Sequence, residues 1–185
     1  MTVSNAGKWS PWYNEIAYGA DPAPYADTAT YQMGADWLTG CANVEDWGCG
    51  TGWARQFFNT SQYTGVDGTA SPFADHVADL TVYRSSVDGV FMRHVLEHNH
   101  QWRRVLDNAV QSFRKRMVLI LFTPMVDNTI IIPPYDNDGI DVPNIAFRHE
   151  DLAERFGRAS FSFTDLPSDT FYGTERIYLL EKPGA

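Results

Sequence analysis

A glycine-rich run, VEDWGCGTG at residues 44–52, carries the residue types whose chemical use is clearest in this chain. A short apolar segment ends in an acid, is followed by Gly48, Gly50 and Gly52, and leads into a helical pattern. This order is typical of a strand that enters a helix through a tight nucleotide-binding turn. A nicotinamide cofactor is disfavoured, because the sixth position counted from Gly48 is Trp53, whose bulky indole would block a pyrophosphate.

A second group of reactive side chains lies in the run RHVLEHNH, residues 93–100. His94, Glu97 and His98 are spaced i, i+3 and i+4, so on a turn or a short helix they would face one way. All three residue types ligate divalent metals, and an imidazole also titrates near working pH, which suits a general base. The run therefore predicts a metal site, a metal-free basic site or a structural cluster.

The glycine-rich run resembles the first motif of the class I S-adenosylmethionine (SAM)-dependent methyltransferases, in which an apolar pair, an acid and an apolar residue precede GCGxG. Three later segments are similar to the same family in order and spacing. They are residues 63–67 (YTGVD, like the second strand), residues 77–80 (VADL, like the adenine segment) and residues 88–98 (DGVFMRHVLEH, like the fourth strand and its turn). The resemblance covers residues 44–124 and, more loosely, the C-terminal part.

For the methionine half of the cofactor, the resemblance implies contacts from the glycine-rich turn. Gly48, Cys49 and Gly50 would present their backbone to it, and Gly52 would belong to the same binding turn. Asp46 would contact the ammonium group directly or through water. A cofactor-binding role for these five residues is what the resemblance predicts.

For the nucleoside half, the resemblance assigns the acids that follow the next two strands. Asp67, 19 residues after Gly48, would hold the ribose hydroxyls, and Gly68 would permit close approach. Asp79 and the Leu80 backbone would meet the adenine. Arg93 ends the fourth strand at the same sheet edge and is included in the cofactor site, although arginines often pair with carboxylates within the protein.

The run around His94 is also similar to the E-x-x-E-H motif of two metal-using branches of that family, the ubiquinone-pathway O-methyltransferases and the small-RNA terminal 2′-O-methyltransferases. His94 stands where those proteins have glutamate, and a histidine ligand would favour a softer metal than magnesium. Many metal-free members carry LEH at this point for structural hydrogen bonds. We therefore predict catalytic roles for His94, His98 and Glu97 without a metal, and a divalent metal is the alternative.

Composition limits the partners of the protein. The net charge of −9 and a pI near 4.8 repel phosphate backbones, so nucleic acid is not an expected substrate. No apolar run approaches the roughly 20 residues that cross a bilayer, and the start MTVSNAGKWS lacks the pattern of a signal peptide. Cys41 and Cys49 do not make a disulfide framework. We expect a cytoplasmic protein without a membrane partner, and the oligomeric state stays open.

The elements that position these residues are expected to form one α/β domain over residues 1–185. The resemblance implies a Rossmann-like, mostly parallel seven-strand sheet with helices on both faces and a C-terminal antiparallel hairpin. Apolar patterns predict the later strands at 63–66, 76–78, 87–92, 117–122, 161–163 and 176–180, and helices at 27–38, 102–113 and 151–156. Arg114, Lys115 and Arg116 are expected to close the second of these helices, where cations suit the helix dipole.

Two segments are expected to enclose the substrates. Residues 1–40, rich in aromatics and proline, would form an irregular arm and a helix that cover the site or one end of the sheet. Residues 123–150 make a connection far longer than the usual 2–6 residues, and long connections after a parallel strand commonly form binding sites. The acceptor pocket is expected there.

These expectations combine into a SAM-dependent methyltransferase that methylates oxygen on a small polyhydroxylated acceptor, such as a sugar or glycan precursor. A sulfonium donor is already activated by its positive charge, so the protein chiefly holds donor and nucleophile in line and excludes water. Two alternatives stay open. One is a metal-dependent RNA 3′-terminal 2′-O-methyltransferase, and the other is a non-catalytic SAM-binding subunit that activates a partner.

Overall fold

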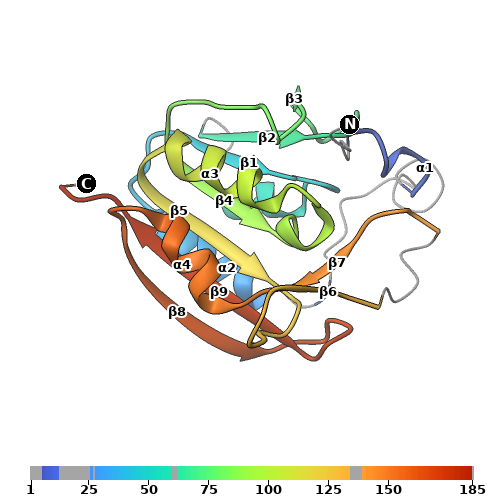
Figure 1. Cartoon of the computed structure of the whole chain (residues 1–185). Helices are drawn as coiled ribbons and strands as arrows, with labels where there is room; N and C mark the ends of the chain where they lie inside the picture. The colour runs from blue at the N-terminus through green and yellow to red at the C-terminus, as the bar shows by residue number, and fades with distance from the viewer. Residues whose placement is uncertain (1–5, 13–25, 27, 60–61, 134–138, 185) are drawn as a thin grey trace.

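Seven strands form one sheet in the order β3-β2-β1-β4-β5-β9-β8 (Figure 1). This computed structural model describes residues 6–12, 26, 28–59, 62–133 and 139–184. Strand β9 runs antiparallel to β5 and β8, and the other neighbouring pairs are parallel. The predicted α/β fold with its C-terminal hairpin is confirmed. The strands are β1 Val44–Trp47, β2 Tyr63–Asp67, β3 His76–Val77, β4 Val87–Arg93, β5 Phe113–Leu121, β8 Ser160–Pro167 and β9 Thr174–Glu181.

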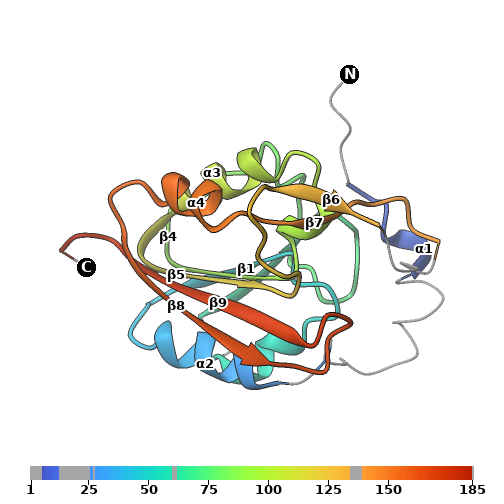
Figure 2. The ribbon, with the colours of Figure 1, turned by 60° about the horizontal axis from the view of Figure 1, so that its bottom comes forward.

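Helices cover both faces of this sheet, as Figure 2 shows. Helix α2 (Ala29–Trp37) and the 3₁₀ helix η2 (Trp53–Phe57) lie on one face. Helix α3 (Trp102–Ser112), helix α4 (His149–Ala153) and the 3₁₀ helix η4 (Glu154–Phe156) lie on the other. Strand β5 is buried from Met117 to its end, as an apolar strand covered on both faces should be. None of the helices in the described ranges has the length and apolarity to span a bilayer.

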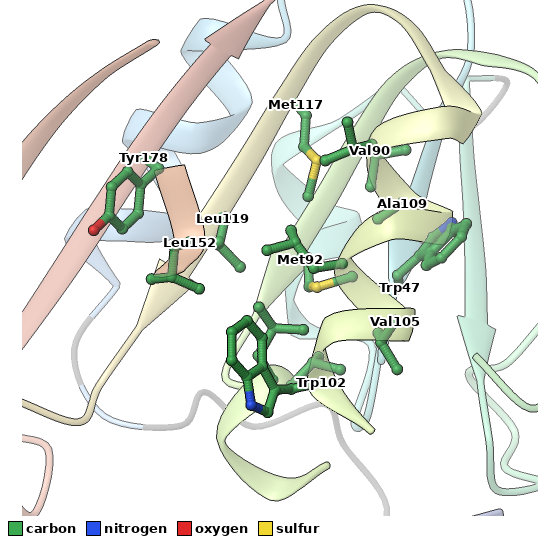
Figure 3. Close-up of a cluster of buried hydrophobic side chains, with 14 of the residues drawn as sticks. Trp47, Val90, Met92, Trp102, Val105, Ala109, Met117, Leu119, Leu152 and Tyr178 are labelled. Atoms are coloured by element: carbon green, nitrogen blue, oxygen red, sulfur yellow. The ribbon is translucent and has the colours of Figure 1, made fainter. Parts of the chain in front are cut away.

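The larger core lies between α3 and the sheet (Figure 3). Val105 and Ala109 are one turn apart on α3 and are fully buried against Met92 and Leu119 of the central strands. The i, i+4 spacing puts such side chains on one face of a helix. The predicted amphipathic helix over residues 102–113 is therefore confirmed, except that it ends at Ser112.

The basic run after α3 does not close that helix. Strand β5 already begins at Phe113, so Arg114, Lys115 and Arg116 are strand residues. Arg114 and Lys115 pair with the two oxygens of Asp88 at 2.9 and 2.8 Å. The prediction of a helix end was wrong here, because ion pairs to neighbouring strands use these cations in place of the helix dipole.

Two local features go beyond the sequence prediction. The helical pattern after the glycine-rich turn forms the 3₁₀ helix η2. The long connection over residues 123–150 contains a hairpin that the sequence did not predict, made of β6 (Ile130–Ile132) and β7 (Asn144–Ala146). The Thr123 hydroxyl donates to the Ile145 carbonyl at 2.8 Å and ties the connection to the end of β5.

Replacing Phe91 by alanine tests the smaller core. Phe91 is 1% exposed and its ring stacks with Tyr31 of α2 at 6.1 Å, so truncation should lower the free energy of unfolding by about 3–5 kcal/mol. Urea denaturation measures this loss. The matched control is Phe171→Ala, at a position 69% exposed, which should cost less than about 1 kcal/mol. Equal losses in the two variants would contradict this packing.

Candidate functional site

The turn that follows β1 needs its glycines. Gly48, Gly50 and Gly52 have φ values of +79°, +52° and +72°, in the left-handed region that other residues rarely adopt. There is also no room for a side chain at Gly48, because a Cβ atom there would lie 2.3 Å from Cγ2 of Val95. The turn thus brings the chain after β1 against the segment after β4, at the carboxyl edge of the sheet, where α/β proteins bind ligands.

The amides of this turn donate within the protein. The N–H groups of Gly48 and Cys49 both donate to the Val66 carbonyl, at 2.7 and 3.2 Å, and the Gly50 N–H donates to Oδ2 of Asp67 at 3.0 Å. A phosphate-binding turn instead aims such N–H groups at its anionic ligand. In this chain, these three hydrogen bonds hold the turn to the end of β2.

Two acids lie beside the turn, as the sequence predicted. Asp67 is the last residue of β2, and its other oxygen accepts the Thr69 N–H at 2.8 Å. Asp46 is 3% exposed and accepts a hydrogen bond from the Tyr63 hydroxyl. Burial raises the pKa of Asp46 to about 7, helped by the nearby charge of Asp67, and burial also raises the pKa of Asp67. A cation placed beside these buried acids would favour their ionised forms and would be attracted to them.

The residues predicted to meet adenine follow β3. Oδ1 of Asp79 accepts the Thr81 N–H at 2.9 Å, so the carboxylate shapes the turn that begins there. Leu80 is 7% exposed, and its carbonyl accepts the Asn108 side-chain amide at 3.0 Å. Asp67 pairs in register with Val77 of β3, two residues before Asp79. The structure thus places Asp79 and Leu80 on the connection beside the end of β2.

The described part of the N-terminal arm, residues 6–12, crosses the same edge and includes the short helix α1 (Ser10–Trp12). The Gly7 N–H donates to the Gly68 carbonyl at 2.9 Å, directly after Asp67. Lys8 Nζ donates to the carbonyl of Asp141, in the long connection, at 2.6 Å. The Trp9 and His98 rings meet at 5.2 Å between centroids. The arm therefore joins the end of β2, the turn after β4 and the 123–150 connection.

His94, Glu97 and His98 have three different hydrogen-bond partners, although both imidazole rings and the Glu97 carboxyl group also contact Phe122. His94 Nε2 lies 2.5 Å from Oε1 of Glu175 on β9, whereas Glu97 accepts the Phe122 N–H at 2.8 Å. His98 Nδ1 lies 3.1 Å from the Pro143 carbonyl. The reason is that the 3₁₀ helix η3 covers only Leu96–His98, and His94 precedes it with φ +57°. In the described ranges, no three His, Cys, Asp or Glu side chains gather in an arrangement that could hold a metal.

Burial sets the protonation of Glu97 and His98. Glu97 has no exposed surface, and desolvation raises its pKa to about 8, so the carboxyl is neutral near pH 7. Desolvation also lowers the pKa of His98 to about 4, so this imidazole is neutral as well. Its Nδ1 must then carry the proton and donate to the Pro143 carbonyl. Both side chains thus tie η3 to its neighbours, and His94 is the better candidate for a base.

Arg93, predicted to join the cofactor site, forms hydrogen bonds with α2 and β9. The side chain is 6% exposed and donates to Glu175 Oε1 at 2.6 Å, to the Thr30 hydroxyl at 3.2 Å and to the Tyr31 hydroxyl at 3.0 Å. Glu175 is completely buried. Sequence reasoning missed Glu175, because an acid at the start of a C-terminal strand carries no local signal of a partner 82 residues earlier.

Comparison with known proteins rests on structure. No protein-family profile matches the sequence, and no curated protein matches it significantly. The 1,6-didemethyltoxoflavin-N1-methyltransferase of Burkholderia thailandensis, solved with S-adenosylhomocysteine, has a TM-score of 0.67 and 16% identity, covering 93% of this chain and 80% of that one. The N-methyltransferase NodS of Bradyrhizobium japonicum WM9 in complex with S-adenosylhomocysteine reaches 0.64 at 12% identity, covering 96% and 99%. The cyclase SpnF reaches 0.65 at 14%, covering 96% and 93%.

These likenesses define the class of fold. The chain has the class I fold of SAM-dependent methyltransferases, so the resemblance seen in the sequence is confirmed at the level of the fold. The similar structures differ in the activities that their names state, and one is called a cyclase. The fold by itself therefore leaves the acceptor open.

Replacing Glu97 by glutamine should remove one pH dependence of stability. Between the pKa of about 4.5 of an unfolded glutamate and about 8 in the folded protein, the native state holds one more proton than the unfolded state. The free energy of unfolding of the wild type therefore falls as pH rises through this window, and Glu97→Gln should not show that fall.

Chemical denaturation at pH 5 and pH 9 measures this effect. The stability of Glu97→Gln relative to the wild type should rise between these values by an amount on the order of a few kcal/mol. The control is Asp165→Asn, because the pKa of Asp165 is lowered by its hydrogen bond to Arg176 and its titration ends below pH 5. A flat difference for Glu97→Gln would show that Glu97 is ionised in the folded protein.

Proposed function

We propose that this chain is a SAM-dependent methyltransferase that methylates a hydroxyl of a small polyhydroxylated acceptor, such as a sugar or glycan precursor. The observation that carries the proposal is the glycine turn held to Asp67 by the Gly50 N–H at the carboxyl edge of a class I methyltransferase fold. That edge is where this architecture binds ligands. The left-handed glycine turn and two buried acids at that edge support this cofactor.

The turn and the strand beside it would border the cofactor. Gly52 itself packs against Phe73, since a Cβ atom on Gly52 would lie 2.8 Å from Cβ of Phe73. Asp67 would hold the ribose hydroxyls, and Asp79 with Leu80 would border the adenine. When bound, the cofactor supplies a methyl group activated by a sulfonium charge. The buried acids Asp46 and Asp67 favour a cation with an ammonium group.

The acceptor side supports a small ligand. The arm reaches the 123–150 connection through Lys8 and Asp141, and it reaches His98 through Trp9. These contacts bring several elements over one edge of the sheet, which suits the enclosure of a small molecule and the exclusion of water. The net charge of −9 disfavours RNA, and His94, Glu97 and His98 each have a hydrogen-bond partner within the protein.

A reducing, cytoplasmic setting agrees with this function. Cys41 and Cys49 are both buried free thiols.

The third possibility, a SAM-binding subunit without activity of its own, differs from the proposal in one measurable respect, which is turnover by the purified chain alone.

Replacing Asp67 by alanine tests the cofactor site. Isothermal titration calorimetry with S-adenosylhomocysteine should show binding to the wild type and affinity lowered about 10- to 100-fold in Asp67→Ala, since hydrogen bonds to a charged group contribute about 1.5–3 kcal/mol. Asp165→Ala, which removes an acid from the β8–β9 hairpin, is the control and should bind like the wild type. Absence of binding to the folded wild type would refute the proposed cofactor.

A screen with methyl-labelled donor tests the acceptor class. Pools of sugars, glycan precursors, other metabolites and RNA would be incubated with the purified chain, with and without a chelator. We expect the labelled methyl group to appear on a polyhydroxylated small molecule as an O-methyl ether. The rate of labelling should be the same with and without the chelator. Label on RNA that the chelator abolishes would favour the metal-dependent alternative, and no label in any pool would favour the non-catalytic subunit.

A further inference from the structure

His94 has an unusual backbone for a histidine. In the described ranges, only Ala26 and His94 are non-glycine residues with positive φ, and His94 has φ +57°. Such a conformation costs energy and persists only when the surroundings hold it. The His94 N–H donates to the Ile120 carbonyl at 3.0 Å, and the ring lies 4.8 Å from the Phe122 ring. The backbone thus turns the imidazole toward β9 at the carboxyl edge of the sheet.

A buried carboxylate receives that imidazole. Oε1 of Glu175 lies 2.5 Å from His94 Nε2 and 2.6 Å from a terminal nitrogen of Arg93, and Oε2 accepts the Thr30 hydroxyl at 3.0 Å. Burial raises the pKa of Glu175, and the permanently charged Arg93 opposes that rise and favours the carboxylate form. The carboxylate accepts hydrogen bonds and cannot donate one, so Nε2 of a neutral His94 carries the proton. Nδ1 is then the basic nitrogen.

We propose that Glu175 is a positioning residue, which holds His94 in the Nε2–H tautomer so that Nδ1 can act as the general base of the transfer. This inference rests on the proposed function. In the step, Nδ1 takes the proton of the acceptor hydroxyl while that oxygen forms a bond to the methyl carbon. The bond between that carbon and the sulfur breaks, and its electron pair stays on sulfur. The products are an O-methyl ether, a neutral thioether and a protonated His94.

The rest of the cluster favours this assignment over a purely structural one. The Arg93–Glu175 ion pair links β4 to β9 without any help from His94. The imidazole adds a third group to a carboxylate already paired, and its side chain keeps 12% of its surface exposed, against 1% for Glu175. His98, another histidine of the run, donates to the Pro143 carbonyl, and burial lowers its pKa to about 4, so it is a weak base. His94 is the imidazole of this run that a carboxylate orients.

The first test reads the tautomer and needs no acceptor. Long-range ¹H–¹⁵N correlation spectra of protein labelled at histidine distinguish the two ring nitrogens, and the signals lost in His94→Gln assign His94. In spectra recorded over a pH series, we expect neutral His94 to carry its proton on Nε2. The Nδ1–H tautomer, or a ring that stays doubly protonated throughout the series, would overturn the proposal. S-adenosylhomocysteine binding by the same sample reports on the proposed cofactor separately.

The second test removes the carboxylate without leaving a lone buried charge. The double variant Arg93→Met with Glu175→Leu replaces the pair by apolar groups, a change that buried ion pairs often tolerate. The matched control is Arg116→Met with Glu181→Leu, which removes an ion pair between β5 and β9 at 3.0 Å. In the first variant His94 should show a mixture of tautomers, and in the control it should keep the proton on Nε2.

The kinetic readout uses the acceptor found by the label screen. The Arg93/Glu175 variant should lose about 10- to 100-fold in kcat with little change in the KM for the acceptor, because a misdirected base affects the transition state more than binding. The control variant should stay within about threefold of the wild type. Unchanged kcat and tautomer in a folded Arg93/Glu175 variant would show that the cluster is only structural.

Discussion

The hydrogen bond from the Gly50 N–H to the Asp67 carboxylate is the contact on which the candidate site depends. It joins the turn after β1 to the end of β2, and two further amides of the turn donate to Val66 of the same strand. The turn can follow this path only because its glycines accept positive φ and the short distance to Val95. These contacts thus fix the curvature of the turn and the position of the acid beside it.

Burial then assigns different tasks to chemically similar groups. Glu97 and Glu175 are both completely buried, but only Glu175 has an arginine against it. Desolvation raises the pKa of both carboxyl groups, and that of Glu97 to about 8, whereas the ion pair and hydrogen bonds of Glu175 with Arg93 oppose the rise there. The same contrast separates the histidines, since His98 donates to a backbone carbonyl and His94 meets a carboxylate. Protonation at this edge follows from neighbours more than from residue type.

Several structural features were predictable from local pattern. The apolar residues of β5 and the i, i+4 spacing in α3 identify a central strand and an amphipathic helix without further information. The local sequence pattern gave a wrong prediction where the same residue types fit two different structures. Arg114, Lys115 and Arg116 suit a helix end as well as a strand flanked by carboxylates, and only the approach of Asp88 and Glu181 decides between them. The β6–β7 hairpin escaped prediction because its strands have three residues each.

The amino-acid sequence by itself determined where most strands and the acids that follow them lie along the chain. It also determined the need for glycine at the turn and the resemblance to one class of fold. Each of these depends on residues close together in the chain. Tertiary structure decided which way His94, Glu97 and His98 point, since each meets a partner on a different element. It also supplied Glu175, which lies 81 residues from His94 and becomes its neighbour only when β9 inserts beside β5. Side-chain direction and protonation depend on contacts between distant segments, which no local pattern records.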